Sequence, residues 1–393
     1  MTDAMCLIPK LQEALAFSGR QIRATVERYP DLFPMYTQAG RWKHEGEAWT
    51  HWCDGFLPGI LWLLHRHTGD PWYRQQAERY SLPLEPRKLD RSVHDLGFIF
   101  MSSYHHWHRL TRESTLRDVL IQAGRTMGLR FKTPGGYLYS FIGPQSLFID
   151  IMMNVGIIFY AARETQDEAL HQMAMDHCLT TRRVLVRGDG STAHEGIFDL
   201  ASGEFLRQST HQGYRGDSCW SRGLAWSLYG FGIAYRYAHD RRFLETAELN
   251  ADYYIEHTPD HGVPPWDFDA PEDRRRQPDS SAAAIAASGL LDLAGFTTSR
   301  AKSRLYHDVA FRILDTLTTE EYLANTTPGW EGILKRGVYH TSKGLGVDES
   351  VMWGEYFFVE ALTKALRAHR VWLEGSVSTR PADTNPRRPI HGG

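Results

Sequence analysis

The chain repeats one local pattern, in which an apolar segment with helical spacing is followed by a short polar turn and a second helical segment. The turns recur roughly every 45 to 75 residues, a period typical of repeated helical hairpins with loops of varying length between them. They lie at Thr68–Ala77, Thr111–Leu116, Thr165–Ala174, His239–Ala247 and Ser299–Leu305. The repeat therefore predicts an all-α fold.

Long connections separate these hairpins. Loops that are this long and this rich in aromatic residues favour a closed ring of hairpins whose loops gather around a cleft at one end, with a long solenoid as the alternative. The long turn-rich segments are 88–95, 133–149, 187–219 and 257–279.

Helical spacing predicts about eleven or twelve helices from Leu11 onward. The β-like runs are few, the clearest being Arg182–Arg187 and Gly136–Phe141. Asp279 followed by two serines and three alanines predicts a helix start, because an acidic cap precedes strong helix formers. We predict one domain over residues 1–370 and a disordered tail over 371–393, where Ser, Thr, Pro and Gly are enriched.

Charge and composition exclude several classes of protein. The net charge of -3 gives no electrostatic basis for binding nucleic acid or an anionic membrane. No apolar run approaches the length of a membrane span. The cysteines at 6, 53, 178 and 219 form no close pairs, and the first ten residues lack a secretory pattern. We therefore expect a cytoplasmic protein, monomeric or homodimeric, without a disulfide framework.

The segment Asp199–Gly232 is the richest in candidate binding residues. It begins as a glycine-punctuated loop that contains Gln212 and becomes an apolar helix that starts with Trp220, Arg222 and Trp226. Arginine binds carboxylates through two parallel hydrogen bonds, and indoles stack on sugar rings. The segment predicts a site for a small, flat, hydroxylated anion. The alternative is a buried helix start whose arginine pairs with a nearby carboxylate.

Two carboxylates lie in unusual settings. Asp150 has apolar neighbours on both sides, and we expect desolvation to raise its pKa into the range of a general acid and base. Asp95 precedes an apolar helix. The alternatives are a helix N-cap for Asp95 and a buried acid paired with a core arginine for Asp150.

Metal and nucleotide sites lack support in the sequence. Histidines 105, 106 and 108 point to different faces of one helix, and metalloprotease, Walker, dinucleotide and serine-hydrolase motifs are absent. We expect no metal and no cofactor. Polar and aromatic residues at helix starts, including Trp52, His194 and Tyr339, are instead expected to line one end of the ring.

Nine motifs, in order over roughly residues 10–368, resemble unsaturated glucuronyl hydrolases of glycoside hydrolase family 88. The resemblance implies an (α/α)6 barrel of six helical hairpins with a loop-lined active-site cleft at one end. The motifs are Trp52–Phe56, His94–Phe98, Asp150–Asn154, Arg182–Asp189, Thr210–Gly213, Trp220–Trp226, Trp266–Phe268, Asp279–Ala284 and Trp353–Phe358.

The resemblance also implies an activity. The substrate is an oligosaccharide left by a polysaccharide lyase, such as a glycosaminoglycan fragment, and its non-reducing sugar is a 4,5-unsaturated uronic acid. Asp150 matches the acid that protonates C4 of this vinyl ether and activates the water that attacks C5, after which the hemiketal opens and the glycosidic bond breaks. Asp95 matches the aspartate that holds ring hydroxyls. The residues that match substrate contacts are Trp52, His94, His194, Gln212, Trp220, Arg222, Trp226 and Tyr339.

One departure and three alternatives accompany this resemblance. The family carries a tryptophan before a Gly-Pro pair and a longer loop ahead of the catalytic acid, whereas Phe141–Pro144 here leads directly toward Asp150. The departure concerns the identity and sulfation of the next sugar. The alternatives are an unsaturated rhamnogalacturonyl hydrolase, a sugar epimerase that uses His94 and His194 as its acid–base pair, and a non-catalytic carbohydrate-binding protein.

Overall fold

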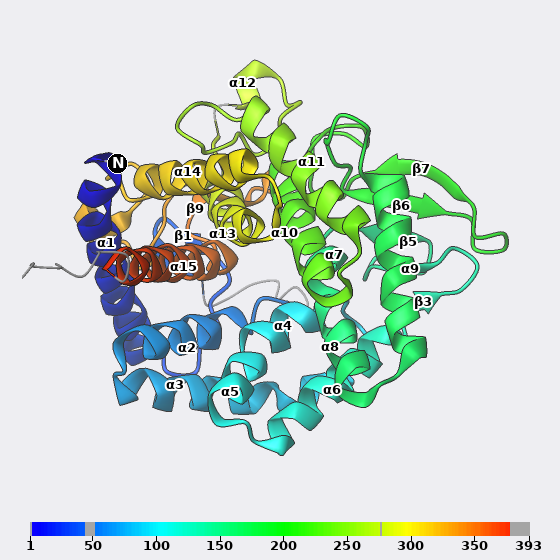
Figure 1. The fold of residues 1–393 in the computed structure, drawn as a ribbon, viewed down its shortest axis with the longest axis horizontal. Coiled ribbons are helices and arrows are strands. Elements are labelled where there is room, and N and C mark those ends of the chain that lie inside the picture. Colours follow the sequence, from blue (N-terminus) through cyan, green and yellow to red (C-terminus); the bar gives the residue numbers. More distant parts are fainter. Residues whose placement is uncertain (1, 44–51, 276, 378–393) are drawn as a thin grey trace, which may run out of the picture.

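The computed structural model describes residues 2–43, 52–275 and 277–377. Helices form an inner and an outer layer around a closed ring (Figure 1). The described residues contain fifteen α-helices: α1 (Thr2–Arg28), α2 (Phe56–Thr68), α3 (Pro71–Ser81), α4 (Leu96–Ser102), α5 (Tyr104–Thr111), α6 (Ser114–Gly128), α7 (Ile151–Asn154), α8 (Gly156–Thr165), α9 (Glu168–Leu185), α10 (Ser221–Ala238), α11 (Arg241–His257), α12 (Glu272–Arg275), α13 (Ser280–Phe296), α14 (Arg300–Leu317) and α15 (Met352–Val377). Short 3-10 helices cover Leu82–Leu89, Ala324–Thr326 and Thr341–Lys343.

The ring closes through the inner helices α2, α4, α8, α10, α13 and α15, each of which contacts the next, with α15 returning to α2. Each inner helix pairs with an outer helix, in the order α3, α6, α9, α11, α14 and α1. The sixth hairpin thus joins the first and last helices of the chain. This arrangement confirms the predicted (α/α)6 barrel.

Three of the hairpin turns share one local structure. A residue in the left-handed conformation ends the inner helix, and an aspartate that follows it caps the outer helix by accepting a backbone N–H bond. The pairs are Gly69 with Asp70, Gln166 with Asp167, and His239 with Asp240. In these turns, one residue therefore ends the first helix and the next residue begins the second.

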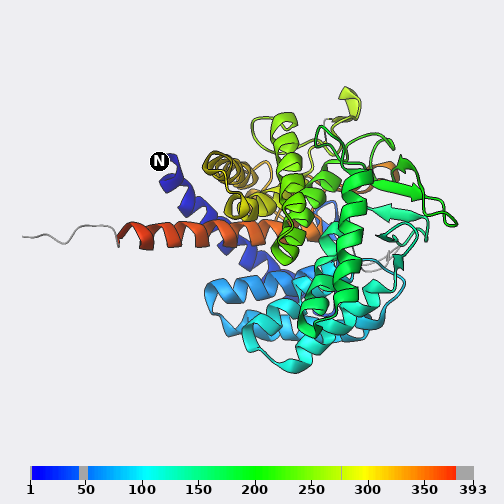
Figure 2. The same cartoon turned by 45° about the vertical axis from the view of Figure 1, so that its right-hand side comes forward.

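Small antiparallel sheets gather at one end of the barrel. Figure 2 shows the strands near the start of α15, while the C-terminal half of α15 projects from the opposite end. The strands are β1 (Thr37–Gln38) with β2 (Arg41–Trp42), β3 (Phe131–Lys132) with β4 (Tyr137–Leu138), β5 (Ser146–Phe148) with β6 (Glu195–Phe198) and β7 (Phe205–Ser209), and β8 (Gly337–His340) with β9 (Leu345–Glu349).

Small residues let the inner helices approach closely. Five alanines in the first half of α13 are fully buried because this helix packs between α10, α14 and α15, which explains why that half is rich in small apolar residues: Ala282, Ala283, Ala284, Ala286 and Ala287. A side chain at Gly97 of α4 would meet the Cα of Asn154 in α7 at 2.4 Å. Close packing of this kind fixes the helix starts that carry the site.

Three predictions about elements need correction. Arg182–Arg187 is not a strand, because α9 continues to Leu185 and buries Thr181, Val184 and Leu185 at helical spacing. The helices are more numerous than expected, in part because α7 and α12 are single short turns. Finally, α15 continues to Val377, past the predicted boundary at 370, and residues 378–393 of the predicted tail lie outside the described residues.

Other predictions hold. Asp279 caps α13 by accepting the backbone N–H of Ser281, and β4 lies within the predicted run Gly136–Phe141. Within the described ranges, every helix falls short of the length and apolar character that crossing a membrane requires.

Candidate active site

Asp150 lies between the end of strand β5 and the start of the short helix α7. β5 pairs with β6, and the backbone N–H of Ile149 donates to the carbonyl of His194 at 2.9 Å, so the chain is anchored directly before Asp150. Asp150 follows directly and precedes α7. Its neighbours Phe148, Ile149 and Ile151 are buried, but 13% of its own side chain stays exposed, enough for a ligand to reach it.

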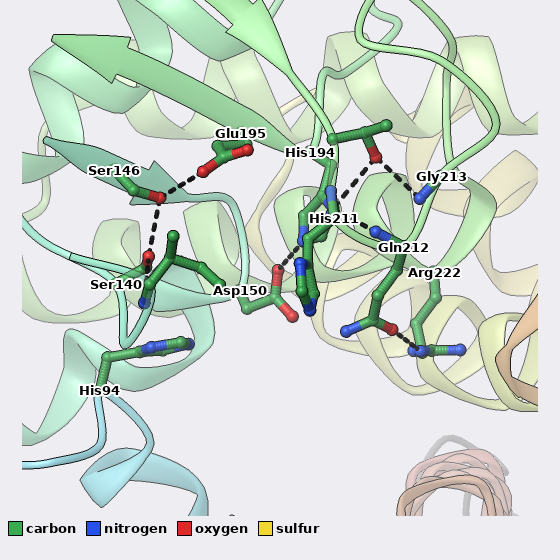
Figure 3. Close-up of polar contacts among 12 residues, drawn as sticks. His94, Ser140, Ser146, Asp150, His194, Glu195, His211, Gln212, Gly213 and Arg222 are labelled. Atoms are coloured by element: carbon green, nitrogen blue, oxygen red, sulfur yellow. Dashed lines mark hydrogen bonds and ion pairs between the residues drawn. The ribbon is translucent and has the colours of Figure 1, made fainter. Parts of the chain in front are cut away.

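His194 faces Asp150 in a fixed tautomer (Figure 3). Its Nδ1 accepts backbone N–H bonds from His211 at 3.0 Å and Gln212 at 3.1 Å, so the ring proton must sit on Nε2. Nε2 lies 3.5 Å from Oδ2 of Asp150, somewhat longer than an ordinary hydrogen bond. Oδ2 has no hydrogen-bond partner among the described residues.

His94 and Asp95 repeat this arrangement. The backbone N–H of Phe141 donates to Nδ1 of His94 at 3.0 Å, and Nε2 lies 3.4 Å from Oδ1 of Asp95. Burial lowers the pKa of His94 to about 3, so its ring is neutral. Each carboxyl therefore faces one histidine whose orientation is set by loop backbone.

The two carboxyls differ in the direction of their pKa shifts. Burial, and then the charge of Asp150, raises the pKa of Asp95 well above its ordinary value. Burial alone would also raise the pKa of Asp150, but the contact with His194, and then the nearby His94 ring and the charge of Arg222, lower it below the ordinary value. The predicted rise at Asp150 is therefore wrong, because its partners outweigh desolvation. Carboxyls shifted apart in this way suit opposite acid–base states.

The structural alternatives for both acids fail in detail. Asp95 occupies the N-cap position of α4, yet its side chain makes no capping hydrogen bond. The ion-pair contact of Asp150 is with His194 rather than with a core arginine. The side chain of Asp95 therefore does not cap a helix, and the side chain of Asp150 is not the partner of a core arginine.

Arg222 is 1% exposed and is bonded by protein acceptors. Nη1 lies 3.3 Å from Oδ2 of Asp279 and bonds the carbonyl of Val338, while Nη2 donates to the carbonyl of Tyr339 at 2.8 Å and to Oε1 of Gln212 at 2.5 Å. The expectation that its two donors grip the ligand needs correction, since both already have partners. Arg222 instead contributes positive charge near Asp150 and orients the amide of Gln212.

The indoles are arranged differently from the prediction. Arg222 lies over Trp220, 4.3 Å from the ring centroid, and over Trp353 at 5.2 Å. Trp226 is fully buried and packs against Phe98 and Phe357 rather than beside the guanidinium. Helical spacing placed it on α10 correctly, but the neighbouring inner helices α4 and α15 cover that face.

Trp52 joins an aromatic wall beside this cluster. Its ring lies 4.8 Å from that of Trp353 and 6.5 Å from that of Tyr339. The structure thus gathers Asp150, His194, Gln212, Trp220 and Arg222 in one place. Trp52 and Tyr339 lie along one side of this group. The His94–Asp95 pair lies close enough for the charge of Asp150 to act on the pKa of both residues.

Three residues at the site were not among the predicted substrate contacts. Phe141 stacks on His94 at 5.7 Å and meets His211 edge-on, while Trp353 is the second indole at Arg222. Trp353 begins a motif already noted, and His211 adjoins Gln212, so proximity in sequence was a usable signal for both. Phe141 begins the segment in which the chain departs from the family pattern, and that departure was its signal. In the described part of the chain, no group of three or more His, Cys, Asp or Glu side chains is arranged to hold a metal ion.

The N-termini of several helices converge on this site. α4 and α7 begin directly after Asp95 and Asp150, α10 begins directly after Trp220, and α13 begins after Asp279, which bonds Arg222. Helix N-termini carry partial positive charge, which favours anions. The site is therefore polarised for a negatively charged ligand with a face suited to aromatic contact.

Comparisons with known proteins agree with this geometry. Residues 25–264 match the family model of Glycosyl Hydrolase Family 88. The chain is 32% identical over 366 residues to an unsaturated glucuronyl hydrolase of Bacillus sp. (strain GL1), covering 90% of this chain and 95% of that one. An unsaturated chondroitin disaccharide hydrolase of Streptococcus pyogenes serotype M1 is 27% identical, with 92% of each chain covered. The crystal structure of an unsaturated glucuronyl hydrolase specific for heparin superposes with a TM-score of 0.85 at 30% identity, covering 92% of this chain and 98% of that one.

Proposed function

The chain belongs to Glycosyl Hydrolase Family 88, and from that membership we propose that it removes the 4,5-unsaturated uronic acid from the non-reducing end of lyase-generated oligosaccharides. The activities named for its relatives support this substrate class. The single observation that carries the proposal is the pair of Asp150 and His194, beside Arg222, at the end of the barrel where helix N-termini meet.

The charge of the site favours a uronate. Arg222 is buried with one carboxylate, Asp279, and Asp150 also lies within range of its charge. Because the Oε1 of Gln212 accepts from Arg222, the amide Nε2 of Gln212 is directed elsewhere and serves as a donor to the ligand. We infer that Gln212, helped by the helix N-termini, contacts the uronate, while Trp220, Trp52 and Tyr339 pack against its ring.

Asp150 is the general acid and base of the proposed reaction. Its carboxyl gives a proton to C4 of the vinyl ether, then takes a proton from the water whose oxygen bonds to C5, so water adds across the double bond. The resulting hemiketal opens and the aglycone leaves from C1. Asp150 is ionised in the free protein, so it must gain a proton first; a bound uronate brings a like charge and excludes water, and both raise a carboxyl pKa.

Asp95 has a different role in this proposal. Its raised pKa keeps the carboxyl protonated to higher pH than an ordinary aspartate, so it can donate as well as accept hydrogen bonds. His94 fixes one of its oxygens. We infer that Asp95 holds the ring hydroxyls near C4 and C5, where correct orientation contributes strongly to the rate.

A panel of lyase-generated disaccharides tests the proposal. Products of chondroitin, heparin, alginate and pectin lyases are each incubated with the protein, and loss of the ultraviolet absorption of the double bond is followed. Loss with any uronide from the first three supports the proposal, and loss with the pectin product alone identifies the rhamnogalacturonyl alternative. Proton exchange at a saturated sugar, abolished by His94→Ala and His194→Ala, identifies the epimerase. Binding of every product without consumption identifies a carbohydrate-binding protein.

The cytoplasmic location and the monomeric or homodimeric state remain part of the proposal. Free, buried thiols at Cys53, Cys178 and Cys219 support a reducing compartment. Sedimentation velocity of the purified protein measures the oligomeric state directly.

A further inference from the structure

A cavity of about 810 Å³ lies at the end of the barrel opposite the candidate active site. α10 begins beside Asp150 with Arg222, but Arg236, near its end, lines the cavity. Trp353, in the first turn of α15, lies at the site, and Lys364, several turns later, lines the cavity. The cavity reaches inward as far as Gly97, Phe98 and Met153 of α4 and α7, but none of the candidate catalytic or substrate-binding residues lines it. Its volume lies within the range of about 300–1,000 Å³ that is usual for small-molecule sites.

The acids that line the cavity are neutralised within the protein. Glu164 pairs with Arg163 at 2.9 Å, Asp292 pairs with both Arg236 at 2.6 Å and Lys364 at 2.9 Å, and Glu360 pairs with Lys364 at 3.3 Å. The guanidinium groups of four other lining arginines, 66, 109, 112 and 367, have no ion-pair or hydrogen-bond partner among residues 2–43, 52–275 and 277–377. The lining thus carries uncompensated positive charge.

Three of these arginines come together from separate helices. After burial, the charges of Arg109 and Arg367 lower the pKa of Arg66, which shows that the guanidinium groups repel one another. Arg66 and Arg109 lie in the last turns of α2 and α5, where the partial negative charge of the helix C-terminus stabilises a cation. This effect does not account for Arg367, because α15 continues to Val377. Repulsion of this kind is relieved when an anion binds.

A buried histidine on the cavity wall supplies a second, independent observation. His106 is 8% exposed, and its Nε2 contacts Oη of Tyr356 at 3.1 Å. Its Nδ1 is buried without a hydrogen-bond partner in the described part of the chain, a costly state that a ligand hydroxyl would relieve. Tyr160, Tyr229 and Tyr356 add aromatic faces to the same lining.

We propose that this cavity is a second ligand site, in which Arg66, Arg109 and Arg367 bind the anionic group of a small acidic saccharide and His106 bonds one of its hydroxyls. The guanidinium groups provide paired donors for a sulfate or carboxylate. The tyrosines provide surfaces for the sugar ring. The site is distinct from the proposed hydrolytic centre and carries no reaction.

Isothermal titration calorimetry with D-glucose 6-sulfate tests the proposal, because this probe is saturated and is not consumed. The wild-type protein is expected to bind it more tightly than D-glucose. The double variant Arg66→Gln/Arg367→Gln is expected to lose roughly tenfold or more in affinity, since two charge-assisted contacts are removed. Arg304→Gln, an exposed arginine on α14, is the matched control and should bind as the wild type does.

Two further measurements establish whether the probe occupies this cavity. Gln212→Ala, at the catalytic end, is expected to leave the affinity unchanged; loss of binding there would place the probe in the wrong site and overturn the proposal. The double variant should unfold at no lower temperature than the wild type in the absence of probe, because repulsion at Arg66 is reduced. Absence of binding by the wild type, or equal binding by the folded double variant, also overturns the proposal.

Discussion

Nε2 of His194 carries the ring proton and lies 3.5 Å from Oδ2 of Asp150, because backbone N–H groups of His211 and Gln212 occupy the other ring nitrogen. The loop after β7 thereby controls the carboxyl that follows β5. Asp150 is poised by a partner that cannot rotate away or change tautomer without breaking two backbone hydrogen bonds.

Replacing His194 with phenylalanine is expected to shift the pH dependence of turnover. The contact with His194 helps to lower the pKa of Asp150, whereas burial raises it. Once His194 is removed, less opposes the effect of burial, so the pKa of Asp150 rises. Because the reaction needs protonated Asp150, activity falls as pH rises through that pKa, and the fall in kcat/KM should move to higher pH. His307→Phe, on α14 at the surface, is the control and should leave the pH profile of the wild type unchanged. If kcat/KM of His194→Phe falls at the same pH as that of the wild type, this role of His194 is refuted.

Asp95→Asn is expected to stabilise the protein at high pH only. The folded-state pKa of Asp95 is raised, so its contribution to stability is complete below the unfolded pKa of about 3.9 and is lost as pH rises toward the folded-state value. Asparagine does not ionise and avoids that loss. Urea unfolding at pH 4 and pH 8 should show a free-energy difference between variant and wild type that grows with pH. A difference that is constant with pH contradicts the assignment.

The barrel could be predicted from sequence because its signals are local. Turns such as Thr165–Ala174 stop one helix and start the next, and their spacing indicates hairpins. The environment of Asp150 could not be predicted, since its neighbours in sequence are apolar while the groups that set its pKa are His194 directly before β6, Arg222 of α10 and His94. Trp353 reaches Arg222 only because the last inner helix closes the ring.

Removing the guanidinium of Arg222 is expected to destabilise the fold as well as the site. Arg222→Met leaves Asp279, which is fully buried, without its cation, and breaking a buried pair in this way costs about 3–5 kcal/mol. The free energy of unfolding from urea titration measures the loss. Arg304→Met should stay within about 0.5 kcal/mol of the wild type. A similarly small effect at Arg222 contradicts the structural role assigned to it.

Gly97→Ala is expected to impair both stability and turnover. The new Cβ would lie 2.4 Å from the Cα of Asn154, so α4 and α7 must separate. Overpacking of this kind costs about 1–3 kcal/mol. Asp95 and Asp150 precede these two helices, and a shift near 1 Å in catalytic geometry lowers rates by about 100-fold.

The control for this prediction is Gly295→Ala in α13, where nothing lies within 4 Å of the added Cβ. Alanine there should leave activity unchanged and should not reduce stability. Equal activity of Gly97→Ala and Gly295→Ala would show that the spacing of α4 and α7 does not matter to the reaction.

The assignment of Asp150 as general acid and base is tested most directly by Asp150→Asn with an unsaturated uronide that the wild type consumes. Asparagine keeps the shape but carries no transferable proton, and loss of general acid–base catalysis lowers rates by about 100-fold or more. The measurement is the rate at which the double-bond absorption disappears, with Asp217→Asn, an exposed carboxyl, as the matched control. The account predicts a folded Asp150→Asn protein with turnover reduced at least to that extent beside a fully active Asp217→Asn; near-normal turnover by Asp150→Asn would contradict it.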